Sequence, residues 1–318
     1  MIDKVYPISG KRVWVAGHKG MAGSALVRRL SRENCEILTV DRREVDLRDQ
    51  AVTEKWMIAE RPEVVFLAAA KVGGIAANDS LPATFLFDNL MIAASVIESA
   101  RRADVEKLMF LGSSCVYPKF APQPIPEEAL LTGELEPTNQ WYAVAKIAGI
   151  KLVEAYRREH GCDFIAVQPT NLYGPGDNFN PATSHVPAAL LRRFHEAKMA
   201  AHDEVVVWGS GTPRREFLEV DDFADGCLFV MEHHSGAEII NIGTGKDITI
   251  ADFAGLIAET VGFNGNLVFD HTRPDGTPQK LLDVSRLTNL GWQSRTDLRE
   301  GLEAYYASFL AGLARTEA

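Results

Sequence analysis

Short apolar runs alternate with longer stretches of mixed polarity through the first half of the chain. A strand that is buried on both faces of a sheet reads as an unbroken apolar run, and such runs predict strands at 12–16, 36–40, 64–69, 107–111 and 164–168. The stretches between them repeat apolar residues at helical spacing, which predicts helices at 21–33, 50–60, 82–103 and 141–160. This alternation is typical of right-handed βαβ units. We therefore expect an α/β fold built on a doubly wound parallel sheet.

The pattern changes after about residue 170, where Pro and Gly become frequent. Segments rich in these residues predict short strands and helices joined by binding loops at 174–176, 209–213 and 273–278. An apolar run at 238–242 predicts one more strand, which rejoins the main sheet. We expect residues 1–172 and 218–245 to form the main domain. The rest, 173–217 and 246–318, is expected to form a smaller α/β lobe that binds substrate.

Composition argues against nucleic-acid and membrane partners. The 318 residues are 46% hydrophobic, and their net charge of −10 repels phosphate backbones. We expect no membrane span, because no stretch reads as long and apolar enough, and no leader, because residues 1–7 are not apolar. The widely spaced cysteines show no metal-ligand pattern, which predicts reduced thiols in a cytoplasmic protein without a metal site. They are Cys35, Cys115, Cys162 and Cys227.

Three glycines separate the first predicted strand from the first predicted helix. Gly17, Gly20 and Gly23 follow G-x-x-G-x-x-G spacing, not the commoner G-x-G-x-x-G. Glycine here lets the backbone approach a pyrophosphate, and the helix N-terminus supplies N–H groups and the positive end of its dipole. Glycine-rich turns also close ordinary strand–helix junctions. The position after the first strand nevertheless favours a Rossmann-type dinucleotide site.

The end of the second predicted strand distinguishes between the nicotinamide cofactors. An acidic residue there holds the ribose hydroxyls of NAD, and a basic one meets the 2′-phosphate of NADP. Asp41 is followed by Arg42 and Arg43, and Lys19 adds another cation. We favour NADP(H), with Asp41 turned outward and the cations left for the phosphate. The alternative is that Arg42 and Arg43 form an exposed turn.

Tyr142 and Lys146 lie four residues apart at the start of the predicted helix 141–160 and share a helix face. An ammonium beside a phenol is expected to lower the phenol pKa, so that Tyr142 can pass a proton to a developing alkoxide. Such a pair also occurs by chance on exposed helices. Here it follows the strand end that carries Ser113 and Ser114, and ligands bind beyond the carboxyl ends of strands in such sheets. We expect both motifs and the glycine turn to face one crevice.

These motifs are similar to those of the extended short-chain dehydrogenase/reductase superfamily. Longer segments resemble the GDP-L-fucose synthase family within it, from about Val13 to Trp292. The segments are AGHKGMAGSA, LAAAKVGGI, FLGSSCVYPK, LEPTNQWYAVAKIAGIK, PTNLYGPGDNF, SHVPAALLRRFHEA, VVVWGSGTPRREFLEVDD and RPDGTPQKLLDV. The resemblance implies an NADPH-dependent bifunctional enzyme, which acts on GDP-4-keto-6-deoxy-D-mannose as a 3,5-epimerase and then as a 4-reductase.

By this resemblance, Cys115 matches the epimerisation base and His185 the acid. Ser113 or Ser114 would hydrogen-bond the C4 oxygen together with Tyr142. A thiol and an imidazole both titrate near enough to neutrality to exchange protons. The alternatives are that Cys115 is a small buried filler and that His185 only begins a helix.

The resemblance also implies binding residues. Cofactor contacts are implied for Gly17, His18, Lys19, Gly20, Met21, Ala22, Gly23, Arg42, Leu111, Gly112, Lys146, Pro169, Asn171, Leu172 and His185. Substrate contacts are implied for Arg193, Trp208, Arg215 and Asp275. Guanidinium forks suit phosphate oxygens, and Asp275 matches a contact to the nucleotide ribose. On spacing alone, Trp208 could equally be a core anchor.

Other functions on this scaffold fit less well. A 4,6-dehydratase is expected to carry an acidic pair where this chain has Ser114 and Cys115, and a UDP-galactose-type 4-epimerase needs no cysteine base. A non-catalytic NADP-binding regulator is expected to lose Tyr142 or Lys146. A GDP-L-colitose-type synthase, which 5-epimerises and 4-reduces a 3,6-dideoxy sugar nucleotide, is not separated by pattern. The helices at 82–103 and 141–160 resemble the family's dimer interface, which implies a homodimer.

Overall fold

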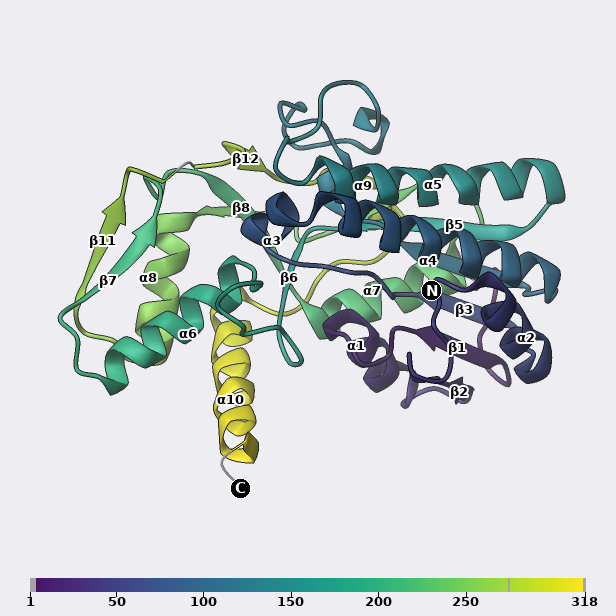
Figure 1. Cartoon of the computed structure of the whole chain (residues 1–318), viewed down its shortest axis with the longest axis horizontal. Helices are drawn as coiled ribbons and strands as arrows, with labels where there is room; N and C mark the ends of the chain where they lie inside the picture. Colours follow the sequence, from purple (N-terminus) through teal and green to yellow (C-terminus); the bar gives the residue numbers. More distant parts are fainter. Residues whose placement is uncertain (1–3, 274, 317–318) are drawn as a thin grey trace.

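The computed structural model describes residues 4–273 and 275–316. Met1–Asp3, which belong to the stretch 1–7 where no leader is expected, lie outside the described residues. Pro274, from the RPDGTPQKLLDV segment, also lies outside them. The main sheet of the described chain has six parallel strands in the order β2-β1-β3-β4-β5-β9 (Figure 1). They are β1 (Arg12–Ala16), β2 (Glu36–Leu38), β3 (Val64–Leu67), β4 (Lys107–Leu111), β5 (Asp163–Pro169) and β9 (Ile240–Ile242).

The strand order turns back between β1 and β3, and a reversal of this kind opens a ligand crevice beyond the carboxyl ends of the strands. The apolar run expected to rejoin the sheet contains β9, which pairs with β5 at the sheet edge. The loops that follow β1, β3, β4 and β5 therefore all leave the sheet at the same end. Sequence-distant functional residues can meet there.

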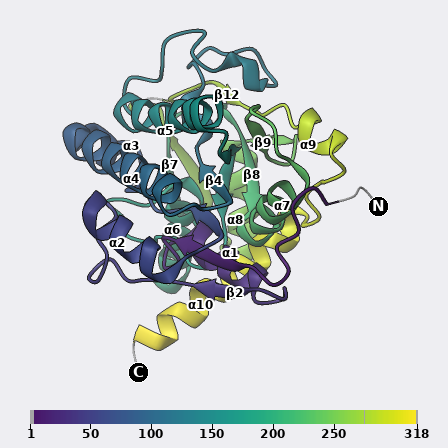
Figure 2. The same ribbon diagram turned by 90° about the vertical axis from the view of Figure 1, so that its right-hand side faces the viewer.

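Helices cover both faces of this sheet, as Figure 2 shows. On one face lie α1 (Met21–Leu30), α7 (Val220–His233) and α9 (Ser285–Asn289), and on the other α2 (Gln50–Glu60), α4 (Pro82–Arg102) and α5 (Gln140–His160). Because side chains alternate along a strand, β1 sends Val13 and Val15 to the first layer and Trp14 and Ala16 to the second. The doubly wound α/β fold predicted from the sequence is confirmed.

The second lobe is assembled from short elements on the left of Figure 1. They are β6 (Asn171–Tyr173), α6 (Val186–Met199), β7 (Glu204–Trp208), β8 (Arg214–Glu219), β10 (Asp247–Thr249), α8 (Ile250–Val261), β11 (Asn266–Asp270), β12 (Gln279–Lys280) and α10 (Leu298–Thr316). β8 pairs with β6, β10 and β12, while β7 pairs with β11. Phe217 of β8 stacks on Phe253 of α8 with ring centroids 3.9 Å apart, which anchors the lobe core.

Helix α4 corrects one expectation. By its length and its mean hydropathy of 1.3 over an 18-residue window, α4 could cross a membrane. The expectation that no stretch of the chain is long and apolar enough to do so is therefore wrong. Half of that window is buried inside the protein. Val96 and Ile97 pack in the layer that also holds Met57 of α2 and Ile150 of α5. The apolar character of α4 is thus that of a helix that covers the sheet.

Candidate active site

The glycine turn after β1 leaves space at its middle residue. Gly17 has a φ of +91°, and a Cβ there would lie 2.6 Å from the main-chain nitrogen of Ala69. A Cβ on Gly23 would lie 2.1 Å from the Gly17 carbonyl oxygen, so close backbone packing requires both outer glycines. A Cβ on Gly20 would meet that oxygen at an ordinary 3.5 Å.

Gly20 is also the N-cap of α1, and the described residues place no side-chain cap on it and no acidic residue in the first turn. The first N–H groups of α1 are therefore left for an anion such as a pyrophosphate. His18 and Lys19 form the tip of the turn, and Lys19 is exposed. Met21 and Ala22 open the helix and pack partly against the core. These residues fit the predicted dinucleotide site.

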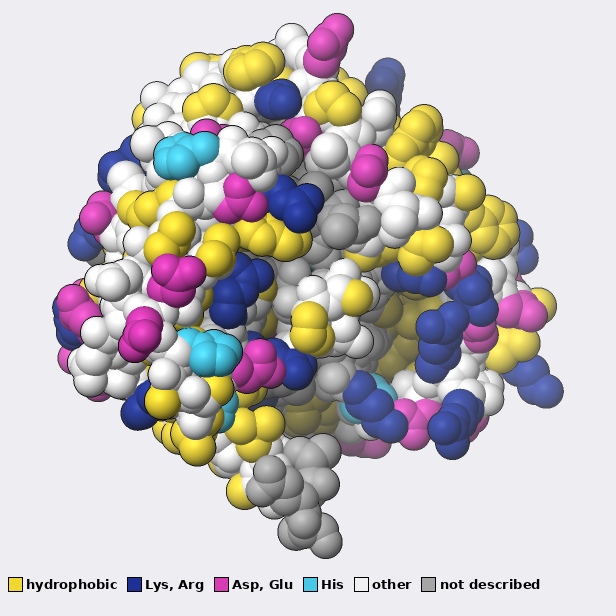
Figure 3. All heavy atoms as spheres, turned by 60° about the vertical axis from the view of Figure 1, so that its left-hand side comes forward, with side chains coloured by type: hydrophobic (Ala, Val, Ile, Leu, Met, Phe, Trp, Pro, Cys, Tyr) yellow, Lys and Arg dark blue, Asp and Glu magenta, His cyan; other side chains and the backbone are white. Residues whose placement is uncertain are grey.

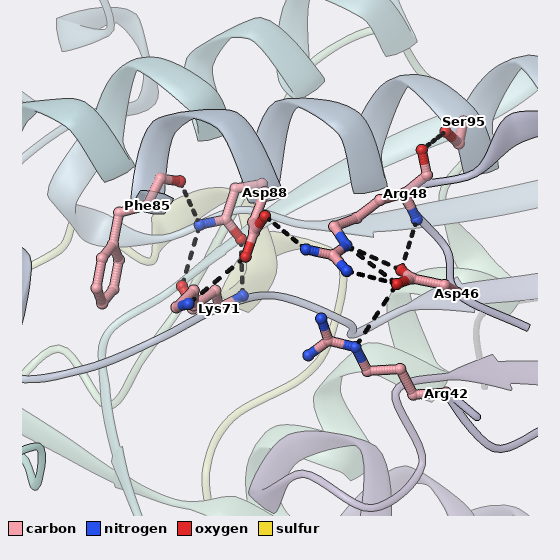
Figure 4. Close-up of polar contacts among 8 residues, drawn as sticks. Arg42, Asp46, Arg48, Lys71, Phe85, Asp88 and Ser95 are labelled. Atoms are coloured by element: carbon pink, nitrogen blue, oxygen red, sulfur yellow. Dashed lines mark hydrogen bonds and ion pairs between the residues drawn. The ribbon is translucent and has the colours of Figure 1, made fainter. Parts of the chain in front are cut away.

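At the ribose end, one expectation fails. Asp41 is not turned away from the cations but forms an ion pair with Lys19, which holds the Asp41 pKa below its usual range. Arg42 stays 72% exposed, with its Nε 4.0 Å from Asp46 Oδ2. Figure 4 shows the terminal nitrogens of Arg42 directed away from Asp46. The terminal nitrogens of Arg42 and the exposed side chain of Arg43 are therefore accessible to a phosphate.

A charged network fixes the loop that carries Arg42 (Figure 4). Arg48 makes hydrogen bonds of 2.6 and 3.0 Å to the carboxylate of Asp46, and its Nη1 lies 3.0 Å from Asp88 of α4. Lys71, after β3, lies 3.5 Å from the same Asp88, and its main-chain N–H donates to Asn89 at 2.8 Å. The β2–α2 loop and the loop between β3 and α3 (Ile75–Ser80) are thus tied to the same turn of α4.

The turn after β4 is rigidly held. The Ser113 N–H donates to Oε1 of the buried Gln168 at 2.9 Å, and a Cβ on Gly112 would lie 2.0 Å from that oxygen. The Ser113 Oγ accepts the Cys115 N–H at 3.2 Å and begins a short 3₁₀ turn, Ser114–Val116. Ser114 is buried, whereas Ser113 is partly exposed. Of the two predicted serines, the geometry therefore favours Ser113 as the one that meets a ligand.

Tyr142 and Lys146 face this turn from the start of α5. The Ser113 hydroxyl acts on the Tyr142 phenol and by itself lowers the pKa of that group. Lys146 is 4% exposed, and its ammonium donates to the Leu111 carbonyl oxygen at 2.6 Å, 5.8 Å from the centre of the Tyr142 ring. Desolvation raises the Tyr142 pKa, followed by the charge of Cys115, while burial lowers the Lys146 pKa to about 7.

The expectation that Lys146 lowers the Tyr142 pKa is therefore wrong. Burial disfavours the charged form of each group, and the ammonium is directed at a carbonyl oxygen instead of the phenol. Tyr142 is accordingly a neutral phenol, with a proton to donate. This protonation state still suits the role of a proton donor to an alkoxide.

The thiol of Cys115 meets two N–H donors that sequence reasoning missed. Asn139 Nδ2 lies 3.2 Å from Sγ, and Lys280 Nζ lies 3.7 Å from it. Asn139 is the N-cap of α5, three residues before Tyr142, so its place in the TNQWYAVAK segment was an available signal. Lys280 ends β12, 165 positions further along the chain, and only the tertiary fold brings it to the thiol.

His185 begins α6 on the other lobe. The Gly74 N–H donates to Thr183 at 2.9 Å, which ties the segment before His185 to the loop between β3 and α3 (Ile75–Ser80). Desolvation by the surrounding protein lowers the His185 pKa, although the residue still reaches solvent. In the described part of the chain, no hydrogen bond joins His185 to Cys115. The two groups thus come from different lobes and share no hydrogen bond among the described residues.

Three further predicted cofactor residues lie at the end of β5. Pro169 ends the strand and is the register partner of Ile242 on β9. Asn171 Nδ2 donates to the Glu216 carbonyl oxygen at 2.8 Å, and Leu172 packs partly against the main core. The Asn171 side chain therefore joins β6 to β8, and its remaining oxygen is the part that can meet a ligand.

The predicted substrate residues gather at one end of the second lobe. Trp208, the last residue of β7, is 57% exposed and is not a core anchor. The guanidinium groups of Arg193 and of Arg273, which sequence reasoning missed, lie 5.7 and 5.0 Å from its ring centre. Arg215 interacts with the charge of Asp275. An exposed indole beside arginines suits a nucleoside diphosphate.

Figure 3 shows a hollow on this side of the molecule with Lys and Arg side chains along its rim. The Asp275 carboxylate is already engaged, because the Ser210 N–H and hydroxyl donate to it at 2.7 and 2.9 Å. In the described residues, no group of three or more His, Cys, Asp or Glu side chains could hold a metal ion.

Comparison with known proteins gives consistent results. The sequence model of the NAD dependent epimerase/dehydratase family matches residues 13–243. A GDP-L-fucose synthase from Sinorhizobium fredii is 54% identical over 98% of this chain and 99% of its own length. The solved structure of a GDP-L-fucose synthetase from Naegleria fowleri bound to NADP has a TM-score of 0.90 at 27% identity, and covers 98% of each chain.

A relative of the alternative class is more distant. A GDP-L-colitose synthase from Yersinia pseudotuberculosis is 34% identical over 94% of this chain and 98% of its own length. The difference of 20 percentage points from the Sinorhizobium fredii relative favours the GDP-L-fucose synthases.

Proposed function

Because this chain belongs to the NAD-dependent epimerase/dehydratase family, and within it to the GDP-L-fucose synthases, we propose that it converts GDP-4-keto-6-deoxy-D-mannose to GDP-L-fucose. The reaction inverts C3 and C5 beside the C4 ketone and then reduces the ketone with NADPH. One observation carries the proposal. The Cys115 thiol sits at the same turn as the Ser113 hydroxyl, which acts on the pKa of the Tyr142 phenol. A carbon-acid base and a carbonyl-binding pair therefore share one site.

In the epimerisation, the Cys115 thiolate takes the hydrogen from C3 or C5. The C–H electron pair moves into an enolate whose charge develops on the C4 oxygen. The phenol of Tyr142 and the hydroxyl of Ser113 donate hydrogen bonds to that oxygen, which stabilises the charge as it forms. His185, on the opposite lobe, returns a proton to the other face of the ring. Exchange with solvent then restores the thiolate and the imidazolium.

In the reduction, bound NADPH supplies a hydride to C4. Tyr142 gives its phenolic proton to the resulting alkoxide. Lys146 fixes the end of β4 through the Leu111 carbonyl and places a positive charge beneath the phenol. Gly20, with the N–H groups of α1, would hold the pyrophosphate, and Arg42 would hold the 2′-phosphate.

The GDP end of the substrate is assigned to the second lobe. Trp208 offers a flat surface to the base, while Arg193 and Arg215 meet the diphosphate. The ring contacts of Arg193 and Arg273 with Trp208 support this assignment, because they hold guanidinium groups around the exposed indole. Asp275 would meet the ribose.

We also propose a homodimer formed through α4 and α5, which pack against each other. Their outer surfaces expose Phe87, Trp141 and Val144, and Phe87 is 60% exposed. Apolar side chains gathered on neighbouring helices favour a partner helix pair. Sedimentation analysis tests this, with Phe87→Asp and Val144→Asp combined as the disrupting variant. A native chain that stays monomeric at micromolar concentration contradicts the dimer.

We place the protein in the cytoplasm, where thiols stay reduced. Cys35, Cys115, Cys162 and Cys227 are free, which supports this location. Fractionation of cells that express the chain tests it, and recovery of the activity outside the soluble cytoplasmic fraction contradicts it.

The deciding experiment for function is a product analysis. The chain is incubated with GDP-4-keto-6-deoxy-D-mannose and NADPH, and the sugar product is identified by NMR. We expect GDP-L-fucose. A 6-deoxyhexose that keeps its original configuration at C3 and C5 contradicts the epimerase. Faster turnover of the 3,6-dideoxy analogue assigns the chain to the colitose-type reaction instead.

A further inference from the structure

Lys280 carries a positive charge that the reaction described above does not use. It ends β12, is partly buried, and places its Nζ 3.7 Å from the Cys115 Sγ. In the parallel pairing of β12 with β8, Lys280 is the register partner of Arg215. Arg215 in turn interacts with the charge of Cys115. Two cations from neighbouring strands therefore flank one thiol.

The backbone around Lys280 is fixed on both sides. Before it, Gln279 Nε2 donates to Asp247 at 2.6 Å. After it, the Leu281 N–H donates to Gln123 at 2.8 Å, and the Leu282 N–H donates to the buried carboxylate of Glu216 at 3.0 Å. The position of the Lys280 Cα is thus determined by the fold, and the contact with sulfur is not the chance reach of a free surface chain.

The charge balance at the thiol is one-sided. In the described part of the chain, no carboxylate forms an ion pair with Lys280, and the groups that face Cys115 are Lys280, Arg215, Asn139 and Tyr142. Two of these are cations, one is an amide donor and one is a neutral phenol. Asp275 acts electrostatically on Arg215. These groups place N–H donors and positive charge at the sulfur.

We propose that Lys280 is a positioning residue of the epimerisation, whose ammonium holds Cys115 as the proton-accepting thiolate. The proposal rests on the proposed function for its catalytic consequence but not for its effect on the thiol. When the thiolate takes the C3 or C5 hydrogen, the charge moves from sulfur to the C4 oxygen, and Lys280 keeps its own protons throughout. Asn139 completes the arrangement by donating to the same sulfur.

The test measures the thiol directly, in the full chain without substrate. Iodoacetamide reacts with the thiolate, and peptide mass spectrometry reports the alkylation rate of Cys115 at pH 7. We expect Lys280→Met to slow it about five-fold, because the loss of thiolate is partly offset by the greater nucleophilicity of a more basic sulfur. Lys280→Arg restores the rate to within about two-fold. Burial raises the pKa of Cys35, Cys162 and Cys227, so these thiols serve as slow internal references.

Lys246→Met is the matched control, since Lys246 is exposed directly before β10 on the other side of β8. Cys115 in the Lys246→Met variant should be alkylated at the same rate as in the native chain. The deuterium-exchange rate at C3 and C5 should fall in Lys280→Met by a similar factor while NADPH affinity is unchanged.

If Cys115 is alkylated at the native rate in a folded Lys280→Met variant, the proposal is overturned. If Lys280→Met unfolds, Lys280→Arg decides. A folded arginine variant in which Cys115 is alkylated about five-fold more slowly than in the native chain also overturns the proposal. Slowed alkylation in a chain that makes no GDP-L-fucose leaves the thiol contact supported and refutes the proposed function alone.

Discussion

The ammonium of Lys146 donates a hydrogen bond to the carbonyl oxygen of Leu111 at 2.6 Å, at the buried end of β4. Burial lowers the Lys146 pKa to about 7, from about 10.5 in an unfolded chain. Between these values the unfolded chain binds one proton more than the folded chain does. The ammonium therefore costs stability at and below pH 7, and this cost disappears as the pH rises toward 10.

Lys146→Met should accordingly stabilise the fold while it removes turnover. We expect the free energy of unfolding at pH 7 to rise by about 1–2 kcal/mol, less than the full desolvation cost because the Leu111 carbonyl loses its partner. Thermal unfolding at pH 7 and pH 9.5 measures the gain, which should be smaller at the higher pH. Lys151→Met, on the exposed face of α5, is the control. A lower melting temperature for Lys146→Met at pH 7 contradicts the account.

The glycines of the first turn should separate folding from cofactor binding. A Cβ on Gly23 collides with the Gly17 carbonyl, so Gly23→Ala should lower the free energy of unfolding by about 2–3 kcal/mol. A Cβ on Gly20 would make only an ordinary contact with the fold. It would, however, stand at the N-terminus of α1, where we expect the pyrophosphate to bind. Gly20→Ala should therefore weaken NADPH binding at least ten-fold, with a stability change below about 1 kcal/mol. Calorimetric titration and thermal unfolding of both variants check the pair. If Gly20→Ala binds NADPH with native affinity, the pyrophosphate does not bind at this turn.

Arg42 should decide the preference for NADPH. Removal of one charge-assisted phosphate contact costs about 1.5–3 kcal/mol, so Arg42→Ala should raise the KM for NADPH roughly 10- to 100-fold. The KM for NADH, which carries no 2′-phosphate, should stay unchanged. Arg32→Ala, an exposed arginine after α1, is the control. Equal effects on the two cofactors argue against the phosphate contact.

Tyr142→Phe should separate the two stages of the reaction. The variant keeps the ring but loses the proton that the C4 alkoxide needs, so NADPH oxidation should fall about 10²- to 10⁴-fold. Deuterium exchange at C3 and C5 should persist at a reduced rate, because Ser113 still donates to the C4 oxygen. Stopped-flow absorbance and NMR follow the two stages. Reduction at the native rate removes Tyr142 from the mechanism.

The main domain was predictable because its signals are local. The buried strands at 12–16 and 107–111 read as continuous apolar runs and are β1 and β4. The first helix ends at Leu30 instead of residue 33, because the N–H groups of Arg32 and Glu33 donate to carbonyl oxygens three residues back, in 3₁₀-type hydrogen bonds. Helix ends are set by such local competition, which apolar spacing does not report.

The contents of the second lobe and of the thiol site were less predictable. β10 and β12 have three and two residues, too few to show a period, and they exist because β8 pairs with both. Lys280 meets Cys115 only through that pairing. The Tyr142 pKa was expected to fall because the sequence shows the neighbouring lysine but not the burial of both groups. Burial and long-range pairing are properties of the assembled fold.

We propose that Cys115 is the base of a second reaction, epimerisation, at the carbons beside the ketone that is later reduced. The most direct measurement is deuterium incorporation at C3 and C5 of GDP-4-keto-6-deoxy-D-mannose in D₂O, followed by NMR for the native chain and for Cys115→Ser. Serine keeps the size of the side chain, but its hydroxyl is far too weakly acidic to supply a base at pH 7. We predict that the substitution lowers exchange at least 100-fold while NADPH affinity stays within two-fold of the native value. Exchange at the native rate in Cys115→Ser contradicts the claim.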